Sequence, residues 1–550
     1  MAELDYKNKR FLVVDSIKQS RDMLKIFCYS LGVKQVDTSH YSGDILSQCE
    51  EINYDVILLG YDLGHNKKNG QQLLEELRAK KLINRQCIVI MITAEVSQSM
   101  VLAALEHKPD EYLTKPYTMK DLSTRISRCF NKKMDMQAIY HAMDQKDSPL
   151  VIHLCNRAIN NDSLYKNECL GIKSRQYFDL KQYDKAKEIY DAYLGSPNCQ
   201  WAALGLGKIA LIEQNYNIAE QYFTAIIEDN EYYLSAYDWL AKSYQLTNEA
   251  SKAEEVLENA LLVSPRSVSR LKQYAQLCID NNQFAKATKA LSKTNELALH
   301  SVHKNPENAL LFIESLLEYS QTLNLVEVKR LNIKAFDMLA KMQRDFNNQE
   351  TKVIALFLAA RLHDKAKDVA LTRSSLIEAE RLLEKFRKQI SIRGTFTIAK
   401  ALIALRRVSK AENLLAELAQ ENPDDMEILS EIVALSDRPI SDKDKAAAQT
   451  ALEIGVSLYR AGHYVLAIDK LNQALHHFPH HIGIKLNLLQ VLLISFEKDS
   501  KRTQDLNQAK VLVKQFNNLN EDNESYNRFL KLKTKYESLA TFTLKNNEKI

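Results

Sequence analysis

Three polar side chains of different chemistry each stand at or near the end of an apolar run. Asp15 follows the run at 11–14, Thr93 follows the run at 88–92, and Lys115 comes later in the chain. An acid can hold Mg²⁺, while a hydroxyl and an ammonium group bind phosphoryl oxygens. Brought together at one rim, these residue types would form a phosphate-and-metal pocket.

The elements that would position these side chains are buried strands alternating with helices. Apolar runs at 11–14, 56–59 and 88–92 are separated by segments with helical periodicity. Continuous apolar strands between helices indicate a parallel sheet that is covered on both faces. Ligands bind such sheets at the carboxyl ends of the strands. The three polar side chains are therefore expected to converge on one crevice.

Residues 11–15, 91–94 and 112–116 resemble, in order and spacing, the receiver (CheY-like) domain of bacterial response regulators. The resemblance implies a doubly wound, flavodoxin-like α/β domain of five strands, which we assign to residues 1–130. It also implies roles for single residues. Thr93 would be the switch hydroxyl, Tyr112 the aromatic ring that moves on activation, and Lys115 the phosphate-binding lysine, followed by a cis peptide bond to Pro116.

The sequence departs from the receiver pattern at two positions of this pocket. Where the family has the aspartate that accepts the phosphoryl group, this chain has Gly60, which cannot form an acyl phosphate. The second of the family's two consecutive acids is Ser16, so Asp15 stands alone. With two carboxylates missing, we expect magnesium binding to be weak or absent, and no other cofactor.

Asp62 keeps a second interpretation open. It lies two positions beyond Gly60 and could in principle accept the phosphoryl group, although the family uses the backbone carbonyl at that place. The favoured interpretation is a pseudo-receiver that does not use phosphotransfer, and the alternative is a regulator that is phosphorylated on Asp62.

From residue 131 to 550 the sequence predicts an all-α superhelical solenoid. Segments with a period near 34 place small and large residues at matching positions and resemble the tetratricopeptide (TPR) repeat. Small residues at repeat positions 8 and 20 would let the two helices of a repeat touch, and proline at position 32 would stop the second helix. Recognisable copies lie near 167–199, 200–233, 234–267, 268–301, 392–425 and 448–481.

Solenoids of this type bind peptides or partner proteins along a concave surface. Arg175, Lys208 and Lys242 recur one repeat apart at the ninth repeat position, and Trp201 stands at the second position of its repeat. Cations beside a large aromatic ring suit an acidic or C-terminal peptide segment. The alternative is that these are ordinary solvated cations on a charged face.

Composition excludes several classes of protein. Only 13 Gly and 9 Pro in 550 residues argue against an all-β or disordered chain and favour long helices. A net charge of +4 makes nucleic-acid binding through bulk charge unlikely. The eight cysteines form no C-x-x-C pair, which is typical of reduced structural thiols. Because neither a signal peptide nor a membrane-spanning run is found, we expect a cytoplasmic protein.

The chain carries no catalytic motif, and we expect that it is not an enzyme. A Walker loop, G-x-S-x-G, H-E-x-x-H and a dinucleotide fingerprint are all missing from the sequence. Four histidines at 476, 477, 480 and 481 could ligate a transition metal. Pro479 interrupts their helix, however, so a solvated turn is favoured and no metal site is expected.

The sequence as a whole predicts a signalling adaptor of a two-component or phosphorelay type that acts through protein–protein contacts. A sensor kinase or another signalling protein would dock on the receiver, and a partner segment, acidic in the favoured case, would bind the array. A homodimer through the helix expected at 100–105 is also open. Phosphorylation of Asp62 is one alternative function, and a nucleic-acid-binding solenoid is the alternative from another class.

Overall fold

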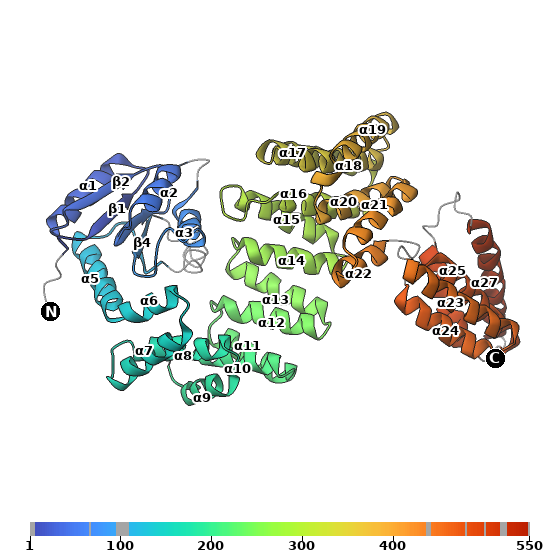
Figure 1. The fold of residues 1–550 in the computed structure, drawn as a ribbon, viewed down its shortest axis with the longest axis horizontal. Coiled ribbons are helices and arrows are strands. Elements are labelled where there is room, and N and C mark those ends of the chain that lie inside the picture. Colours follow the sequence, from blue (N-terminus) through green and yellow to red (C-terminus); the bar gives the residue numbers. More distant parts are fainter. Residues whose placement is uncertain are drawn as a thin grey trace. The chain divides into compact units, whose positions relative to one another are not determined.

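The computed structural model describes residues 6–64, 68–94, 109–197, 199–435, 442–478, 481–499, 502–516 and 525–547. The chain divides into two compact units, residues 1–327 and residues 328–550, which are described separately. Figure 1 shows an α/β domain at the start of the first unit and helices throughout the rest of the chain.

The N-terminal domain contains a five-stranded parallel sheet in the order β2-β1-β3-β4-β5. Its strands are β1 (Arg10–Val14), β2 (Gln35–Ser39), β3 (Val56–Gly60), β4 (Ile88–Thr93) and β5 (Glu111–Thr114). This order reverses direction between β1 and β3, which places the carboxyl ends of those strands at the switch point of a doubly wound sheet. The predicted doubly wound parallel fold is confirmed.

Alternate residues of each strand pack on opposite faces of the sheet. Helices α1 (Lys18–Ser30) and α5 (Met119–Asp135) cover one face, and α2 (Ser42–Glu51) and α3 (Gly70–Ala79) cover the other. On the α1/α5 face, Phe11, Val13 and Leu58 pack against Leu24 and Ile126. On the α2/α3 face, Leu12, Val14, Ile57 and Leu59 pack against Ile45, Leu73 and Leu77. Because both faces are covered, the central strands β1, β3 and β4 are almost continuous apolar runs.

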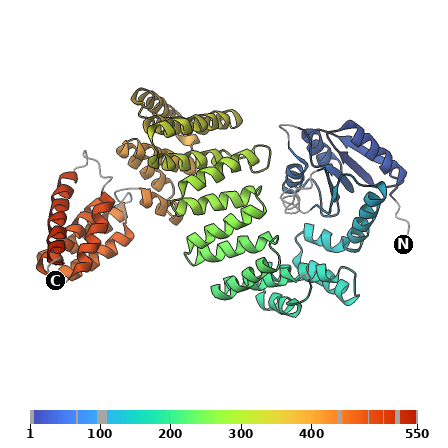
Figure 2. The same cartoon turned by 180° about the vertical axis from the view of Figure 1, so that it is seen from behind.

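Helices follow the α/β domain in the rest of the first unit, and Figure 2 shows the same chain from behind. They are α6 (Gln137–Asp144), α7 (Ser148–Asn160), α8 (Lys166–Asp179), α9 (Tyr183–Tyr193), α10 (Gln200–Ile212), α11 (Tyr216–Asp229), α12 (Leu234–Leu246), α13 (Ala250–Val263), α14 (Val268–Asp280), α15 (Phe284–Ala298), α16 (Pro306–Tyr319) and the short η1 (Ser320–Thr322). Consecutive helices pack against one another, which fits a helical solenoid.

The second unit is also helical among its described residues. Its helices are α17 (Leu325–Asp345, which begins just before the unit), α18 (Gln349–Lys365), α19 (Val369–Phe386), η2 (Arg387–Gln389), α20 (Ile392–Ala404), α21 (Val408–Glu421), α22 (Met426–Leu435), α23 (Asp442–Arg460), α24 (Tyr464–His477), α25 (Ile482–Lys498), α26 (Thr503–Gln515) and α27 (Tyr526–Asn547). Across the described parts of the chain, every helix is too short or too polar to span a bilayer.

A recurrent turn joins the two helices of successive pairs in the first unit. A non-glycine residue in the left-handed conformation follows the first helix, and a fully buried alanine lies five positions later. In four consecutive pairs these are Lys181 and Ala186, Gln214 and Ala219, Asn248 and Ala253, and Asn282 and Ala287. At one such turn the N–H of Asn215 donates to the carbonyl of Ala210 at 2.8 Å, as in a Schellman motif. The alanine then allows the second helix to pack closely against the first.

The α/β domain and the first helices of the array are joined without a flexible connection. Helix α5 continues to Asp135, and the buried Met136 is the cap that α5 shares with α6. Helix α3 also contacts a later part of the unit, at the end of α15 and just after it. Gln72 Nε2 donates to the carbonyl of Leu297 at 3.2 Å, and His303 Nε2 lies 2.7 Å from Glu75 Oε1.

Candidate functional site

Asp15 is the buried acid at the carboxyl end of β1, and only 3% of the residue is exposed. Its Oδ1 accepts the Ile17 N–H at 2.9 Å. Its Oδ2 accepts the Ser20 hydroxyl at 2.8 Å and the Lys115 ammonium at 3.0 Å. The lone carboxylate of the pocket is thus neutralised by a cation and hydrogen-bonded on both oxygens.

Gly60 lies beside Asp15 at the end of β3, with no side chain directed into the pocket. A Cβ added at this position would lie 3.0 Å from the Val14 carbonyl oxygen and 3.5 Å from Asp15 Cγ. On its other side, α3 begins against the backbone of Gly60, because a Cβ at Gly70 would lie 2.3 Å from the Gly60 carbonyl oxygen. The position expected for a phosphoacceptor is therefore tightly enclosed by backbone.

The start of α3 is fixed by a capping box and by a buried carboxylate. The side chain of Asn69 accepts the Gln72 N–H, and that of Gln72 accepts the Asn69 N–H. Glu76, which is buried, forms ion pairs with Lys68 and Lys80. Burial raises the pKa of Glu76, but the hydrogen bonds and charges of the two lysines outweigh it and lower the pKa. These contacts hold α3 close to the end of β3.

Ser16 and Asp62 are brought together through the backbone. The Ser16 hydroxyl donates to the Asp62 carbonyl oxygen at 2.9 Å. The Asp62 carboxylate is exposed, and its Oδ1 accepts the Gly64 N–H at 2.9 Å within its own loop. The Asp62 carbonyl is thus engaged by Ser16, and the Asp62 side chain is bonded to its own loop.

The remaining pocket residues lie at the ends of β4 and β5. Thr93 is buried at the last position of β4, and its carbonyl accepts the Lys115 N–H at 2.7 Å. Tyr112 lies on β5, half-buried against the core on the α2/α3 face. The Lys115–Pro116 peptide bond is cis. Thr93, Lys115 and Asp15 therefore lie at one edge of the sheet, where the sequence places them.

The donor set does not fit a divalent cation. Magnesium is held in proteins by carboxylates, carbonyls and waters. Here Asp15 is the single buried carboxylate of the pocket, it is bonded to Lys115, and the Asp62 carbonyl is bonded to Ser16. Within the described parts of the chain, no group of three or more His, Cys, Asp or Glu side chains is arranged to hold a metal ion.

Three further residues around Asp15 were not expected from the sequence. Ser20 bonds the Asp15 carboxylate, and Arg21 Nη1 donates to the backbone carbonyls of Asp15 and Ser16 at 2.7 and 3.0 Å. Burial, with a smaller contribution from the Asp15 charge, raises the pKa of Tyr117. The position of Ser20 and Arg21 in the first turn of α1, just after the acid, is the signal that could have identified them.

The residues expected to form the groove of the array occupy different environments. Lys208 on α10 and Lys242 on α12 both lie over the ring of Trp239, at 4.6 and 4.7 Å from its centroid. Trp201 packs instead against Tyr190 and Tyr193, at centroid distances of 5.9 and 6.1 Å. The structure thus brings Lys208 and Lys242 together and assigns Trp201 to the packing between neighbouring helices.

Arg175 lies apart on α8, and Trp239 is the ring that the two lysines share. The Arg175 Nε donates to the Gly171 carbonyl on its own helix at 3.0 Å, while the side chain remains exposed. Trp239 was missed by the repeat pattern, although its spacing of three positions from Lys242 puts both on one side of α12. Two cations of neighbouring helices therefore share one aromatic ring.

Two expectations fall wholly or partly outside the described residues. The helix expected at 100–105, on which a homodimer would depend, lies in the undescribed segment 95–108. Of the four clustered histidines, only the side chain of His481 is described, and its Nδ1 accepts the Ile484 N–H at 3.3 Å as a helix cap.

Comparison with known proteins assigns the N-terminal domain. Residues 11–127 match the family described as response regulator receiver domain. A CheY-like receiver domain protein from Methanospirillum hungatei is 24% identical over 23% of this chain and 96% of its own, with a TM-score of 0.21. A Francisella receiver domain is 25% identical over 23% of this chain and 99% of its own, with a TM-score of 0.21. The N-terminal domain is thus a response regulator receiver domain, the domain class of two-component signalling.

Proposed function

We propose that this protein is a signalling adaptor of the two-component type whose receiver does not use aspartyl phosphate. The receiver serves as a docking domain for a sensor kinase or another signalling protein. A TPR-type array binds a protein partner, and the chain has no catalytic activity of its own. Output depends on which surfaces are in contact, not on a covalent modification of the pocket.

One observation carries this proposal: the phosphoacceptor position is Gly60, which has no side chain, and a Cβ there would lie 3.0 Å from the Val14 carbonyl oxygen. Acyl-phosphate formation needs a carboxylate at this point and a cation to neutralise the transferred group. The remaining acid, Asp15, is committed to Lys115 at 3.0 Å. In this ion pair Asp15 is buried and Lys115 is partly exposed, so the pocket is occupied by side chains of the receiver itself.

The array is proposed to bind an acidic segment on the surface around Lys208, Trp239 and Lys242. Two ammonium groups within 5 Å of one ring centroid offer both charge and apolar area to a carboxylate-bearing peptide. Arg175, exposed on α8, extends the cationic surface. The charge-reversal variant Lys242→Glu should weaken capture of such a partner by the full chain, whereas Lys187→Glu, on the second helix of its pair, should leave it unchanged.

The receiver proposal is tested by exposing the full chain to acetyl phosphate and Mg²⁺ and measuring its intact mass. A receiver with its aspartate intact serves as the positive control under the same conditions. We expect no phosphoryl adduct on this protein. We also expect no beryllofluoride-dependent change in the nuclear magnetic resonance signals of Thr93 and Tyr112.

The variant Asp62→Asn separates this proposal from the alternative phosphorylation site. An adduct on the wild type that disappears in Asp62→Asn would overturn the proposal and establish Asp62 as the acceptor. An adduct that persists in this variant would also overturn it, since another acceptor would then be in use.

A further inference from the structure

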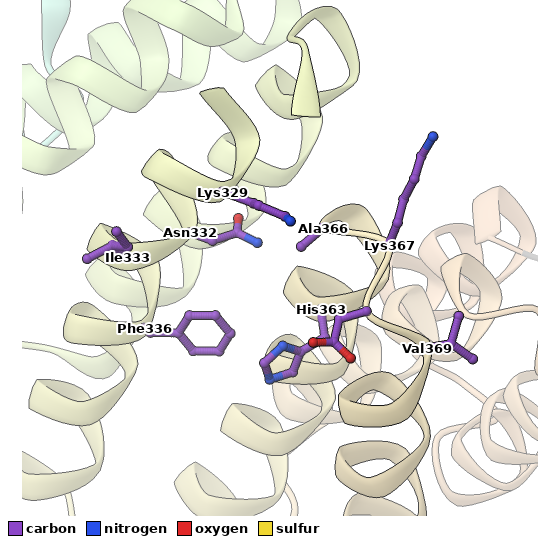
Figure 3. Close-up of a pocket in the computed structure, with 9 residues that line it drawn as sticks. Lys329, Asn332, Ile333, Phe336, His363, Ala366, Lys367 and Val369 are labelled. Atoms are coloured by element: carbon purple, nitrogen blue, oxygen red, sulfur yellow. The ribbon is translucent and has the colours of Figure 1, made fainter. Parts of the chain in front are cut away.

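A cavity of about 540 Å³ lies in the second unit, between α17 and the turn that joins α18 to α19. Figure 3 shows Lys329, Asn332 and Phe336 projecting from α17 towards His363 and Ala366 on the opposite side. This part of the array departs from the 34-residue pattern, because α17, α18 and α19 are 21, 17 and 18 residues long. The cavity thus belongs to a segment with its own geometry.

Asn332 gives this cavity an unused hydrogen-bond acceptor. The residue is only 4% exposed, and its Nδ2 donates to the Leu362 carbonyl at 2.6 Å. That bond fixes the amide, and the buried Oδ1 has no partner. A buried acceptor without a donor is destabilising, so a ligand that supplies an N–H would gain from pairing with it. The amide is therefore positioned to bind a donor such as a peptide N–H.

Apolar surface surrounds the amide. The rings of Phe336 and His363 lie 4.8 Å apart, centroid to centroid, and Ile333 is 70% exposed at the edge of the cavity. Burial lowers the pKa of His363, against the opposing charge of Asp368, so the imidazole is neutral at pH 7. An aromatic or large aliphatic side chain of a ligand would bury apolar area against these rings.

A second hollow of about 290 Å³ continues the first, because both include Lys367, Asp368 and Val369 of the α18–α19 turn. Its lining adds Arg373, Arg406 and Arg407. Five cationic side chains and two carboxylates line the two hollows. The cations are Lys329, Lys367, Arg373, Arg406 and Arg407, and the carboxylates are those of Asp364 and Asp368. Among the described residues, the side chains of Lys329, Lys367, Arg373 and Arg406 have no ion-pair partner.

We propose that these two hollows, here called the α17–α21 groove, bind an acidic linear peptide of a partner protein that carries one aromatic residue. The aromatic side chain occupies the cavity beside Phe336 and His363, and a backbone N–H of the peptide donates to Asn332 Oδ1. Carboxylates of the peptide contact Lys367, Arg373 and Arg406. This inference rests on the proposed role of the array in protein binding, but at a site separate from Lys208 and Lys242.

The composition of the groove favours a peptide over a nucleic acid. A nucleic acid presents a continuous row of phosphates, whereas the cations of the groove lie beside Phe336 and His363, which offer a place for one aromatic side chain. The unsatisfied acceptor Asn332 Oδ1 is suited to a peptide N–H. Specific capture of one aromatic residue between charged contacts is a common way to recognise a linear peptide.

The test uses the full chain and a fluorescein-labelled peptide with one Phe flanked on both sides by Asp and Glu, followed by fluorescence anisotropy. Saturable binding is expected, weakened at least about fivefold by Lys367→Glu or Arg406→Glu. Ile333→Ser, at an exposed position where folding is not at risk, should weaken binding about threefold. Replacing the Phe of the peptide by Ala should lower the affinity to a degree similar to Ile333→Ser. Methylation of the peptide nitrogen whose N–H donates to Asn332 Oδ1 should have an effect of similar size.

The matched control is Lys334→Glu, an exposed cation of α17 outside the groove. Equal weakening by Lys334→Glu would overturn the proposal, because it would show only nonspecific charge attraction. The absence of peptide binding would also overturn the proposal, as would tighter binding of a deoxythymidine oligonucleotide of equal charge. So would a loss of peptide binding that occurs only in Lys242→Glu. The last result would leave the proposed role of the array standing while removing the α17–α21 groove from it.

Discussion

At the scale of single residues, the two departures of the receiver pocket support each other. Loss of the carboxylate at Gly60 leaves Lys115 with Asp15 as its partner, at 3.0 Å. Loss of the second acid puts a hydroxyl at Ser16, which donates to the Asp62 carbonyl. Asp15, Lys115, Ser16 and the Asp62 carbonyl thereby have partners within the chain. Restoring one acid alone would therefore leave the pocket unsuited to a cation.

This leads to a prediction about restored metal binding. The double variant Ser16→Asp/Gly60→Asp should bind Mg²⁺ at least about tenfold more tightly than either single variant, because it supplies both missing carboxylates and releases the Asp62 carbonyl. Isothermal titration with MgCl₂ measures the affinity. Thermal unfolding reports the cost of the new Cβ, which would start 3.0 Å from the Val14 oxygen.

The comparison with Gly60→Asp alone decides whether both acids matter. If that single variant binds Mg²⁺ as tightly as the double variant, then Ser16 is compatible with a working pocket. The departures at Ser16 and Gly60 would then be independent of each other. Asp15→Asn in the double variant serves as the control, since it removes the acid that both arrangements need.

At the scale of elements, three strands of the sheet could be predicted because β1, β3 and β4 are short apolar runs ended by a polar residue or glycine. Strand runs such as 56–59, stopped by Gly60, need only local sequence to be recognised. Asp15, Thr93 and Lys115 could be placed at one edge for the same reason. The contacts of Ser20 and Arg21 were missed: their position just after the acid was a signal, but the bonds themselves depend on how α1 turns back over the end of β1.

The array was predictable only where its turns are regular. The clear copies share a left-handed turn residue followed by a buried alanine, as at Gln214 and Ala219. Between 302 and 391 the helices are longer, the turn at Lys367 is followed five residues later by Thr372, and the period is lost. The buried amide of Asn332 has no sequence signal, since a polar residue on a long helix normally indicates an exposed face.

The recurrent turn gives a prediction with opposite signs at neighbouring positions. Gln214 is exposed and has a φ of 62°, whereas Glu213, just before it, has a φ of −75°. Gln214→Val should lower the free energy of unfolding by about 1–2 kcal/mol relative to Gln214→Gly, because β-branched residues are strained in the left-handed region. At Glu213 the Val variant should instead have the higher free energy of unfolding, because the negative φ there does not require glycine, which loses more conformational entropy on folding.

Urea unfolding of the four variants measures this difference. If valine and glycine rank in the same order at both positions, the left-handed conformation is not what the turn requires. The buried Ala219 stays unchanged in all four variants, so the packing of α11 against α10 is constant across the series.

At the scale of the whole molecule, two ion pairs connect the receiver to the first helix that follows it. Lys133, near the end of α5, has a side chain that is only 13% exposed. Its ammonium lies 2.7 Å from Asp110, which precedes β5, and donates to the Arg85 carbonyl at 2.5 Å. Arg85 in turn forms an ion pair with Asp144 at the end of α6, at 2.9 Å. Charge contacts thus run from the sheet through α5 to α6.

The final prediction concerns this connection. Lys133→Met should lower the stability of the full chain by about 1–3 kcal/mol, because it leaves the largely buried Asp110 carboxylate without its cation. Lys132→Met removes the neighbouring pair with Glu168, whose side chains are both about one-third exposed, and should cost less than about 1 kcal/mol. Hydrogen exchange should accelerate in Lys133→Met on both sides, in β4 and β5 and also in α6 and α7. Faster exchange confined to the sheet would mean that the receiver opens independently of the array, and a signal at the receiver would then have no rigid path into the helices.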